Sequence, residues 1–208
     1  MYTLYWDVGA ASRAPHVLLA ELGVPFELRR VDLDKNEQHS DWYKRVNPHA
    51  RIPALSFDGQ AIYETVAIML TLTERHPDSG ASVQPNDSLR PRFLQFMTYL
   101  TNTVQEALLH VVYPHYYATN EPLALDSVKL SAEQRLSTIW AFLNRELAPG
   151  PYLLGGRFSA ADILLTLFAK WSGRMNPPAD SFENLKRCMD LVEGRPSYQR
   201  ALEREAKG

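Results

Sequence analysis

A segment rich in turn-forming residues, 77–87, divides the chain into two parts with different hydrophobic patterns. In the first part, short apolar and aromatic runs alternate with segments of helical spacing, whereas the second part has helical spacing throughout. The 208 residues suffice for one large domain or two small ones. Because the two patterns require different architectures, we expect a domain of strands and helices at 1–77, a linker at 78–87 and an all-helical domain at 88–208.

The first part has the order strand, helix, strand, helix, strand, strand, helix. Gly23 before Pro25 predicts the end of the first helix, and Asp58-Gly59 between two apolar runs predicts a hairpin. An order that begins with a crossover and ends with a hairpin requires a mixed sheet with helices on its faces. We therefore expect a thioredoxin-like α/β domain with a mixed four-stranded sheet. The expected strands are 1–6, 26–31, 54–57 and 61–63, and the expected helices are 14–22, 37–46 and 66–76.

The second part predicts helices at 89–117, 123–147, 159–172, 182–192 and 197–205. Pro114 should kink or end the first of them. Ser159 and Asp162 have the spacing of a capping box, in which each side chain accepts a hydrogen bond from the other residue's amide. The helix that follows is apolar nearly all round, so we expect it at the centre of the all-α domain.

Charge and composition exclude several classes of function. Lys and Arg total 22 against 24 Asp and Glu, without a basic cluster, which disfavours nucleic-acid binding. No apolar stretch is long enough to span a membrane and no signal peptide is recognisable, so we expect a cytosolic, cytoplasmic protein. Cys188 is the single cysteine, which excludes a CxxC pair, and the histidines have no metal-binding spacing. We expect no metal.

Three segments resemble those of the glutathione S-transferases. They are Asn-Pro-His-Ala-Arg-Ile-Pro-Ala-Leu at 47–55, Ile-Tyr-Glu-Thr at 62–65 and Gly-Gly-Arg-Phe-Ser-Ala-Ala-Asp at 155–162. The likeness covers almost the whole chain in the same order. The start of the chain is most similar to the bacterial beta class, although Ala11 stands where that class has a cysteine. The resemblance implies glutathione as co-substrate, a homodimer and, without the cysteine, a serine-type mechanism.

The resemblance assigns the γ-glutamyl end of glutathione to Glu64 and Thr65. These residues lie between the last strand and a helix, where free amides and the positive end of the helix dipole favour an anion. The alternative is that Thr65 is only an N-cap and Glu64 only a solvated charge.

The same resemblance implies a cis bond between Ile52 and Pro53, with the Ile52 backbone pairing with the cysteine of glutathione like an added strand. Arg51 is placed to neutralise the glycine carboxylate, or it is simply an exposed arginine. His39 is a further candidate for that carboxylate.

Ser12 is the residue expected to carry the chemistry. A free cysteine thiol ionises near pH ~8.5, so a transferase must lower that value to obtain the thiolate at neutral pH. A hydroxyl at the start of a helix can donate to the sulfur while the helix amides add positive potential. The alternative role of Ser12 is an ordinary N-cap. Arg13 and Tyr5 are other candidates for stabilising the thiolate.

The second substrate is expected to be a small hydrophobic electrophile, bound between the two domains near Val8, His110 and Tyr113. The tyrosines of 110–117 are equally suited to packing. The leading hypothesis is therefore an enzyme that adds glutathione to an electrophile. Two alternatives stay open: a non-catalytic interaction protein with the same fold, which the missing cysteine suggests, and a glutathione-dependent peroxidase or isomerase.

Overall fold

The chain forms two compact units in a computed structural model that describes residues 1–207. The N-terminal unit comprises Met1–Pro85 together with the chain from Gly194 onward, and the helical unit comprises Asn86–Glu193. The change of unit after Pro85 lies within the expected linker. The division differs from the expected 88–208 at the C-terminus, because α9 (Pro196–Glu205) packs along α1 (Arg13–Leu22) of the N-terminal unit.

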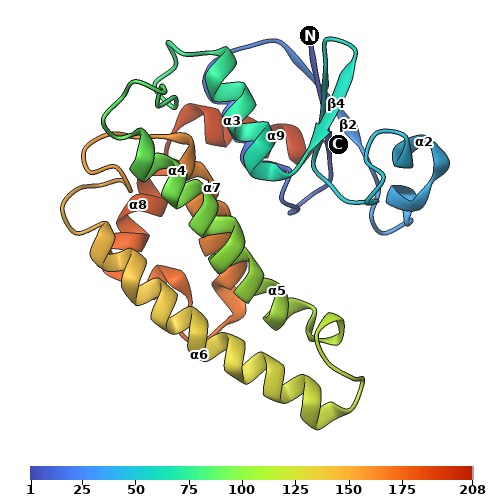
Figure 1. Cartoon of the computed structure of the whole chain (residues 1–208), viewed down its shortest axis with the longest axis vertical. Coiled ribbons are helices and arrows are strands. Elements are labelled where there is room, and N and C mark those ends of the chain that lie inside the picture. Colours follow the sequence, from blue (N-terminus) through green and yellow to red (C-terminus); the bar gives the residue numbers. More distant parts are fainter. Residues whose placement is uncertain (208) are drawn as a thin grey trace. The chain divides into compact units, whose positions relative to one another are not determined.

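The N-terminal unit contains the expected mixed sheet (Figure 1). Its strands are β1 (Tyr2–Trp6), β2 (Phe26–Arg30), β3 (Ala54–Phe57) and β4 (Gln60–Tyr63), in the spatial order β2-β1-β3-β4. β1 is parallel to β2 and antiparallel to β3, and β3 is antiparallel to β4. The thioredoxin-like arrangement is thereby confirmed.

Helices cover both faces of this sheet. α1 and α3 (Thr65–Arg75) contact each other and the sheet on the face of Leu4 and Leu55, both of which are fully buried. Because successive side chains of a strand point to opposite faces, Tyr5 and Ala54 lie on the other face, where they pack with Tyr43 of α2 (Asp41–Lys44). α1 ends at Gly23, whose φ of 68° is the left-handed cap expected there.

The expected helix at 37–46 is two shorter pieces, a 3₁₀ turn at Glu37–His39 and the four-residue α2. The break occurs at Ser40, whose backbone is extended and whose hydroxyl accepts a hydrogen bond from the Tyr43 amide. An N-cap serine requires non-helical backbone at its own position, so Ser40 starts a new helix instead of continuing the first.

The helical unit contains α4 (Arg90–Tyr99), α5 (Glu106–Val112), α6 (Pro122–Glu146), α7 (Ala160–Trp171) and α8 (Glu183–Glu193). The expected helix at 89–117 ends earlier, just before Pro114, and a π-helical segment, Leu100–Gln105, joins α4 to α5. The capping box of α7 is confirmed, and every residue from Ala160 to Ala169 is buried, so α7 is central in its unit.

Among residues 1–207, none of the helices combines the length and the apolar character that crossing a membrane would require. The same residues contain no group of three or more His, Cys, Asp or Glu side chains that could hold a metal ion.

Candidate functional site

The candidate site begins with a row of cross-strand neighbours at one edge of the sheet. Tyr5 of β1 lies beside Arg29 of β2 and Ala54 of β3, and Ala54 lies beside Tyr63 of β4. The strand directions therefore bring the ends of β1, β2 and β4 and the start of β3 to the same edge. With neighbouring strands about 4.8 Å apart, the exits from β1 and β4 are only about 10 Å apart.

Three of the predicted segments leave the sheet at this edge. The turn that contains Ser12 follows β1, the Ile52–Pro53 bond immediately precedes β3, and Glu64 immediately follows β4. His39 lies on the connection after β2. Sheet topology thus brings together four stretches that are far apart in the sequence.

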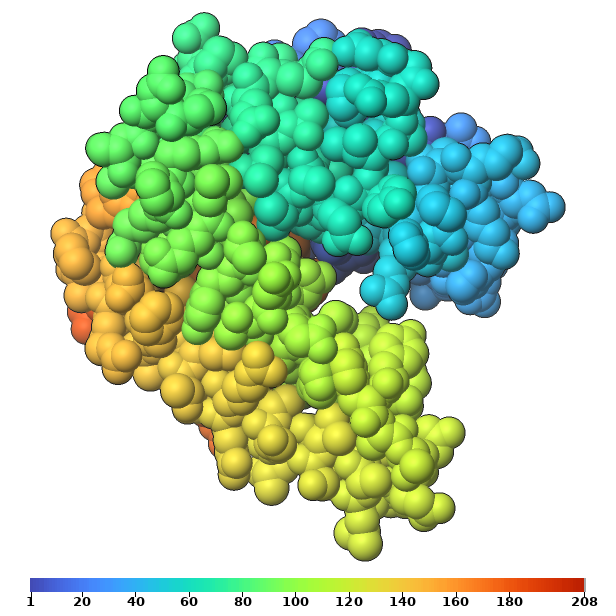
Figure 2. Space-filling model, in the orientation of Figure 1, coloured from blue at the N-terminus to red at the C-terminus, as the bar shows by residue number. Residues whose placement is uncertain are grey.

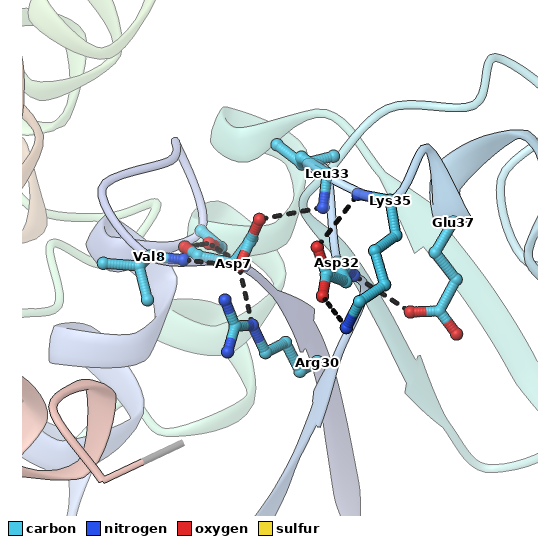
Figure 3. Close-up of polar contacts among 8 residues, drawn as sticks. Asp7, Val8, Arg30, Asp32, Leu33, Lys35 and Glu37 are labelled. Atoms are coloured by element: carbon cyan, nitrogen blue, oxygen red, sulfur yellow. Dashed lines mark hydrogen bonds and ion pairs between the residues drawn. The ribbon is translucent and has the colours of Figure 1, made fainter.

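Asp7 organises the turn after β1 and joins it to the end of β2 (Figure 3). Its carboxylate accepts hydrogen bonds from the Val8 amide at 2.9 Å, the Leu33 amide at 3.0 Å and Arg30 Nε at 2.9 Å. The hydrogen bond that Arg30 donates to the Asp7 carboxylate raises the pKa of Arg30 above its ordinary value. Asp7 was not among the residues predicted from the sequence, where its signal is an acidic residue directly after a buried strand.

Ser12 is the N-cap residue of α1 in position, but its hydroxyl caps nothing in the helix. The hydroxyl donates to the Asp7 carbonyl at 3.2 Å and accepts from the Asp7 amide at 3.3 Å, and Ser12 is only 1% exposed. The hydroxyl proton is therefore directed into the turn, and the expected direct donation from Ser12 to a sulfur stays a prediction.

Backbone amides at the start of α1 are available instead. Within residues 1–207, the amides of Ala11 and Ser12 donate no hydrogen bond, whereas those of Ala10 and Arg13 close the turn. Ala11 is partly exposed. Unpaired amides at the positive end of a helix dipole stabilise an anion.

The segment before β3 contains the expected cis bond between Ile52 and Pro53, which is confirmed. The preceding Arg51 has an exposed side chain, and its carbonyl accepts hydrogen bonds from Tyr43 Oη and Asn47 Nδ2, both at 2.7 Å. Burial raises the pKa of Tyr43, so this phenol stays protonated and donates. Asn47, 2% exposed, is a positioning residue that the sequence analysis did not single out.

The start of α3 differs from a simple N-cap at Thr65. Glu64 occupies the N-cap position with φ 72° and ψ 117°, and Thr65 is the first helical residue and is buried. A positive φ in a residue other than glycine is strained and is often found at functional sites. The Glu64 side chain is exposed, and no side chain caps the helix, so the first amides of α3 lack intrahelical partners.

His39 is exposed at the end of its 3₁₀ turn and belongs to the wall of a polar hollow. Arg30, Lys35 and Ser40 line the same hollow, together with the carboxylates of Asp32 and Glu37. Both of these cations are paired, Lys35 with Asp32 at 2.8 Å and Arg30 with Asp7 at 2.9 Å.

The expected acceptor residues lie in both units. In the N-terminal unit, Val8 is 53% exposed. In the helical unit, the His110 ring stacks on Tyr117 at a centroid distance of 3.5 Å, and its Nδ1 hydrogen-bonds to the Glu106 carbonyl at 2.8 Å. Tyr113 is exposed at the C-terminus of α5. The segment around them, yellow-green in Figure 2, forms an end of the helical unit's surface.

Comparison with protein families gives two matches that together span most of the chain. Residues 10–75 match the model described as glutathione S-transferase, N-terminal domain. Residues 105–204 match the model described as glutathione S-transferase, C-terminal domain.

Individual proteins agree with the family matches. The chain is 28% identical over 204 residues to glutathione S-transferase GstA of Escherichia coli, which covers 97% of this chain and 98% of that protein. Over 82 residues it is 43% identical to the protein LigF of Sphingobium, covering 39% of this chain and 32% of LigF. Among solved structures, a sphingomonad glutathione S-transferase complexed with glutathione has a TM-score of 0.85 at 29% identity, covering 99% of this chain and 100% of that one.

Proposed function

The chain belongs to the glutathione S-transferase family, and we propose that it conjugates the thiolate of glutathione to a small hydrophobic electrophile. One observation carries the proposal: the turn of Ser12, the Ile52–Pro53 bond and the start of α3 leave the sheet at a single edge. Glutathione is a short peptide with charged ends, and such a ligand requires separate partners that lie close together.

The proposed contacts follow from the chemistry at each position. The first amides of α3 and Thr65 bind the γ-glutamyl carboxylate, and the exposed carboxylate of Glu64 binds its ammonium group. The backbone of Ile52 pairs with the cysteine of glutathione before Pro53. Arg51 and His39, both exposed, are the proposed partners of the glycine carboxylate.

We assign the thiolate to the Ser12 turn and distinguish two roles for Ser12. In the first, its hydroxyl donates directly to the sulfur. In the second, the hydroxyl holds the turn closed through Asp7, and the amides of Ala11 and Ser12 stabilise the thiolate. The buried hydroxyl, already donating to the Asp7 carbonyl, supports the second role. Lowering the thiol pKa by about two units requires roughly 2.7 kcal/mol, which charge-dipole interactions at a helix start can supply in part.

For the electrophile, we retain Val8 as a candidate contact of the N-terminal unit, and His110 and Tyr113 as candidate contacts of the helical unit. The exposed side chains of Val8 and Tyr113 support this assignment. We also propose that the protein acts in the cytoplasm as a homodimer, by analogy with its family.

A second candidate function is glutathione binding without conjugation. Ala11 at the turn and the inward-facing hydroxyl of Ser12 favour it, because neither side chain offers a direct donor to the sulfur. Both functions use the same glutathione site, and they differ only in whether the site stabilises the thiolate that conjugation requires.

Two assays test these functions together. The chain should be retained on immobilised glutathione and should consume a chromogenic aromatic electrophile only when glutathione is present. A Glu64→Ala variant should elute earlier, whereas Glu74→Ala, near the other end of α3, should behave like the wild type. Retention without turnover would favour the second candidate, and a chain that shows neither retention nor turnover would contradict both.

A further inference from the structure

A buried ionic cluster joins the C-terminal helix to the first turns of α1. Glu205 Oε2 accepts hydrogen bonds from Arg13 Nε at 2.9 Å and Arg13 Nη2 at 2.7 Å, and its Oε1 lies 3.3 Å from His16 Nδ1. The Glu205 side chain is 3% exposed and that of His16 is fully buried. One carboxylate thus holds two residues that lie on successive turns of α1.

The cluster also neutralises a positive charge at the N-terminus of α1. Arg13 is the first residue of α1, and a cation at that end opposes the helix dipole. The first turn of α1 contains no acidic residue, so Glu205 supplies the missing negative charge from a position 192 residues away. Burial raises the pKa of Glu205, but the hydrogen bonds from His16 and Arg13 outweigh burial, and the net pKa lies below its ordinary value.

Arg13 directly follows the turn assigned to the thiolate. The Arg13 amide donates to the Ala10 carbonyl at 3.1 Å, so the backbone of Arg13 closes the turn that presents the amides of Ala11 and Ser12. Its guanidinium is held by α9 at the same time. Movement of Arg13 therefore moves the proposed thiolate site.

We propose that Glu205 is a positioning residue for glutathione activation: by holding Arg13 and His16 it fixes the first turn of α1, whose amides face the thiolate. This inference rests on the function proposed above. The lowered pKa of Glu205 shows that the cluster also stabilises the fold, so the inference is tested by the thiol pKa and not by stability. The contact of both Arg13 nitrogens with Glu205 fixes the position of the guanidinium.

A second ion pair between the same helices provides a matched control. Glu21, near the C-terminus of α1, pairs with Arg195 and with Ser197 at the start of α9. Glu21→Gln and Glu205→Gln each remove one carboxylate charge from the α1–α9 contact. Only the second removal is next to the Ser12 turn.

The experiment compares both variants with the wild type in three measurements on the full chain. These are the pKa of enzyme-bound glutathione from thiolate ultraviolet absorbance, kcat and KM for conjugation, and amide hydrogen exchange of residues 7–14 without ligand. For Glu205→Gln we expect the bound-thiol pKa to rise by about one unit, kcat/KM to fall about tenfold and exchange in 7–14 to accelerate. Glu21→Gln should leave all three within about twofold of the wild type.

Arg13→Lys is the second variant, which tests the inference if Glu205→Gln fails to fold. Lysine keeps the charge but loses the two-nitrogen contact, so a raised thiol pKa is again expected. An unchanged or lowered thiol pKa in a folded variant would overturn the inference while leaving the proposed function intact. A wild-type chain that does not bind glutathione would instead overturn the proposed function, and the assignment to the thiolate with it.

Discussion

At the scale of single residues, the site depends on side chains that fix the backbone more than on side chains that face a ligand. Asp7 accepts three hydrogen bonds, Ser12 makes two with the backbone of Asp7, and Asn47 holds the carbonyl of Arg51. Each is buried. Backbone amides can then act as ligands, because buried hydrogen bonds keep them in place.

Ser12→Ala separates the two roles proposed for that hydroxyl. If the hydroxyl holds the turn, its loss should accelerate amide exchange in 7–14 and raise the bound-thiol pKa, at a cost of about 1 kcal/mol in unfolding free energy. Hydrogen exchange and thiolate titration on the same variant provide the measurement. Unchanged exchange with a raised thiol pKa would identify a direct donor, and an unaltered pKa would exclude both roles.

Asp7→Asn should be more damaging than its modest change in size suggests. Asparagine has one acceptor oxygen, so at least one of the two backbone amides or Arg30 loses its partner, with an expected loss of about 1–3 kcal/mol in unfolding free energy. Urea denaturation measures the loss. Asp78→Asn, at an exposed position, is the matched control, and equal stability of the two variants would contradict the role given to Asp7.

At the scale of elements, the backbone amides at a helix N-terminus can either be capped by a side chain or be available to a ligand. α1 and α3 begin without side-chain caps, which leaves amides available for a ligand, whereas α7 begins with a complete capping box. Because α4, α6 and α9 also begin without side-chain caps, it is their position at the edge of the sheet that sets the starts of α1 and α3 apart.

The start of α3 should show opposing demands of stability and binding. Glu64→Gly relieves the positive φ, so we expect unfolding free energy to rise by up to about 1 kcal/mol while affinity for glutathione falls. Glu64→Gln keeps the strained backbone and loses only the charge, so it should weaken binding without the gain in stability. Thermal denaturation and calorimetric titration check both. Undiminished affinity in both variants would remove Glu64 from the site.

Asp162 of the α7 capping box should make stability depend on pH. Burial raises its pKa to about 6 against the hydrogen bonds from Leu153 and Ser159, whereas the unfolded chain has an ordinary value near 3.8. Because the folded-state pKa is the higher one, stability is present at low pH and is lost as pH rises from about 4 through 6. We expect this group to add about 2 kcal/mol to the unfolding free energy at pH ~4.5 relative to pH ~7.

Asp162→Asn is the comparison for that prediction. The variant should be less stable than the wild type at every pH, because one capping acceptor becomes a donor. It should also lack the increase in unfolding free energy that the wild type shows at low pH. Denaturant titrations at several pH values measure both effects. A wild-type pH dependence that persists unchanged in the variant would assign it to other groups.

At the scale of the whole molecule, sequence patterns predicted the architecture better than the site. The mixed sheet followed from the crossover and the Asp58-Gly59 hairpin, and α7 followed from its capping box and apolar run. The residues of α9 were predicted as a helix, but the helix was assigned to the wrong unit. Its Glu205 pairs with Arg13, 192 positions away, and no local pattern in the sequence indicates that contact. Ser12 was identified by position, but the direction of its hydroxyl depends on Asp7, which only the folded turn reveals.

The central claim is that three chain segments meet at one edge of the sheet to hold one glutathione molecule. A crystal structure of the full chain with glutathione tests it most directly. We predict the γ-glutamyl group at Glu64 and Thr65, the cysteine backbone along Ile52, and the sulfur within hydrogen-bonding distance of the Ala11 or Ser12 amide. Glutathione bound away from this edge, or touching only one of the three segments, would contradict the account.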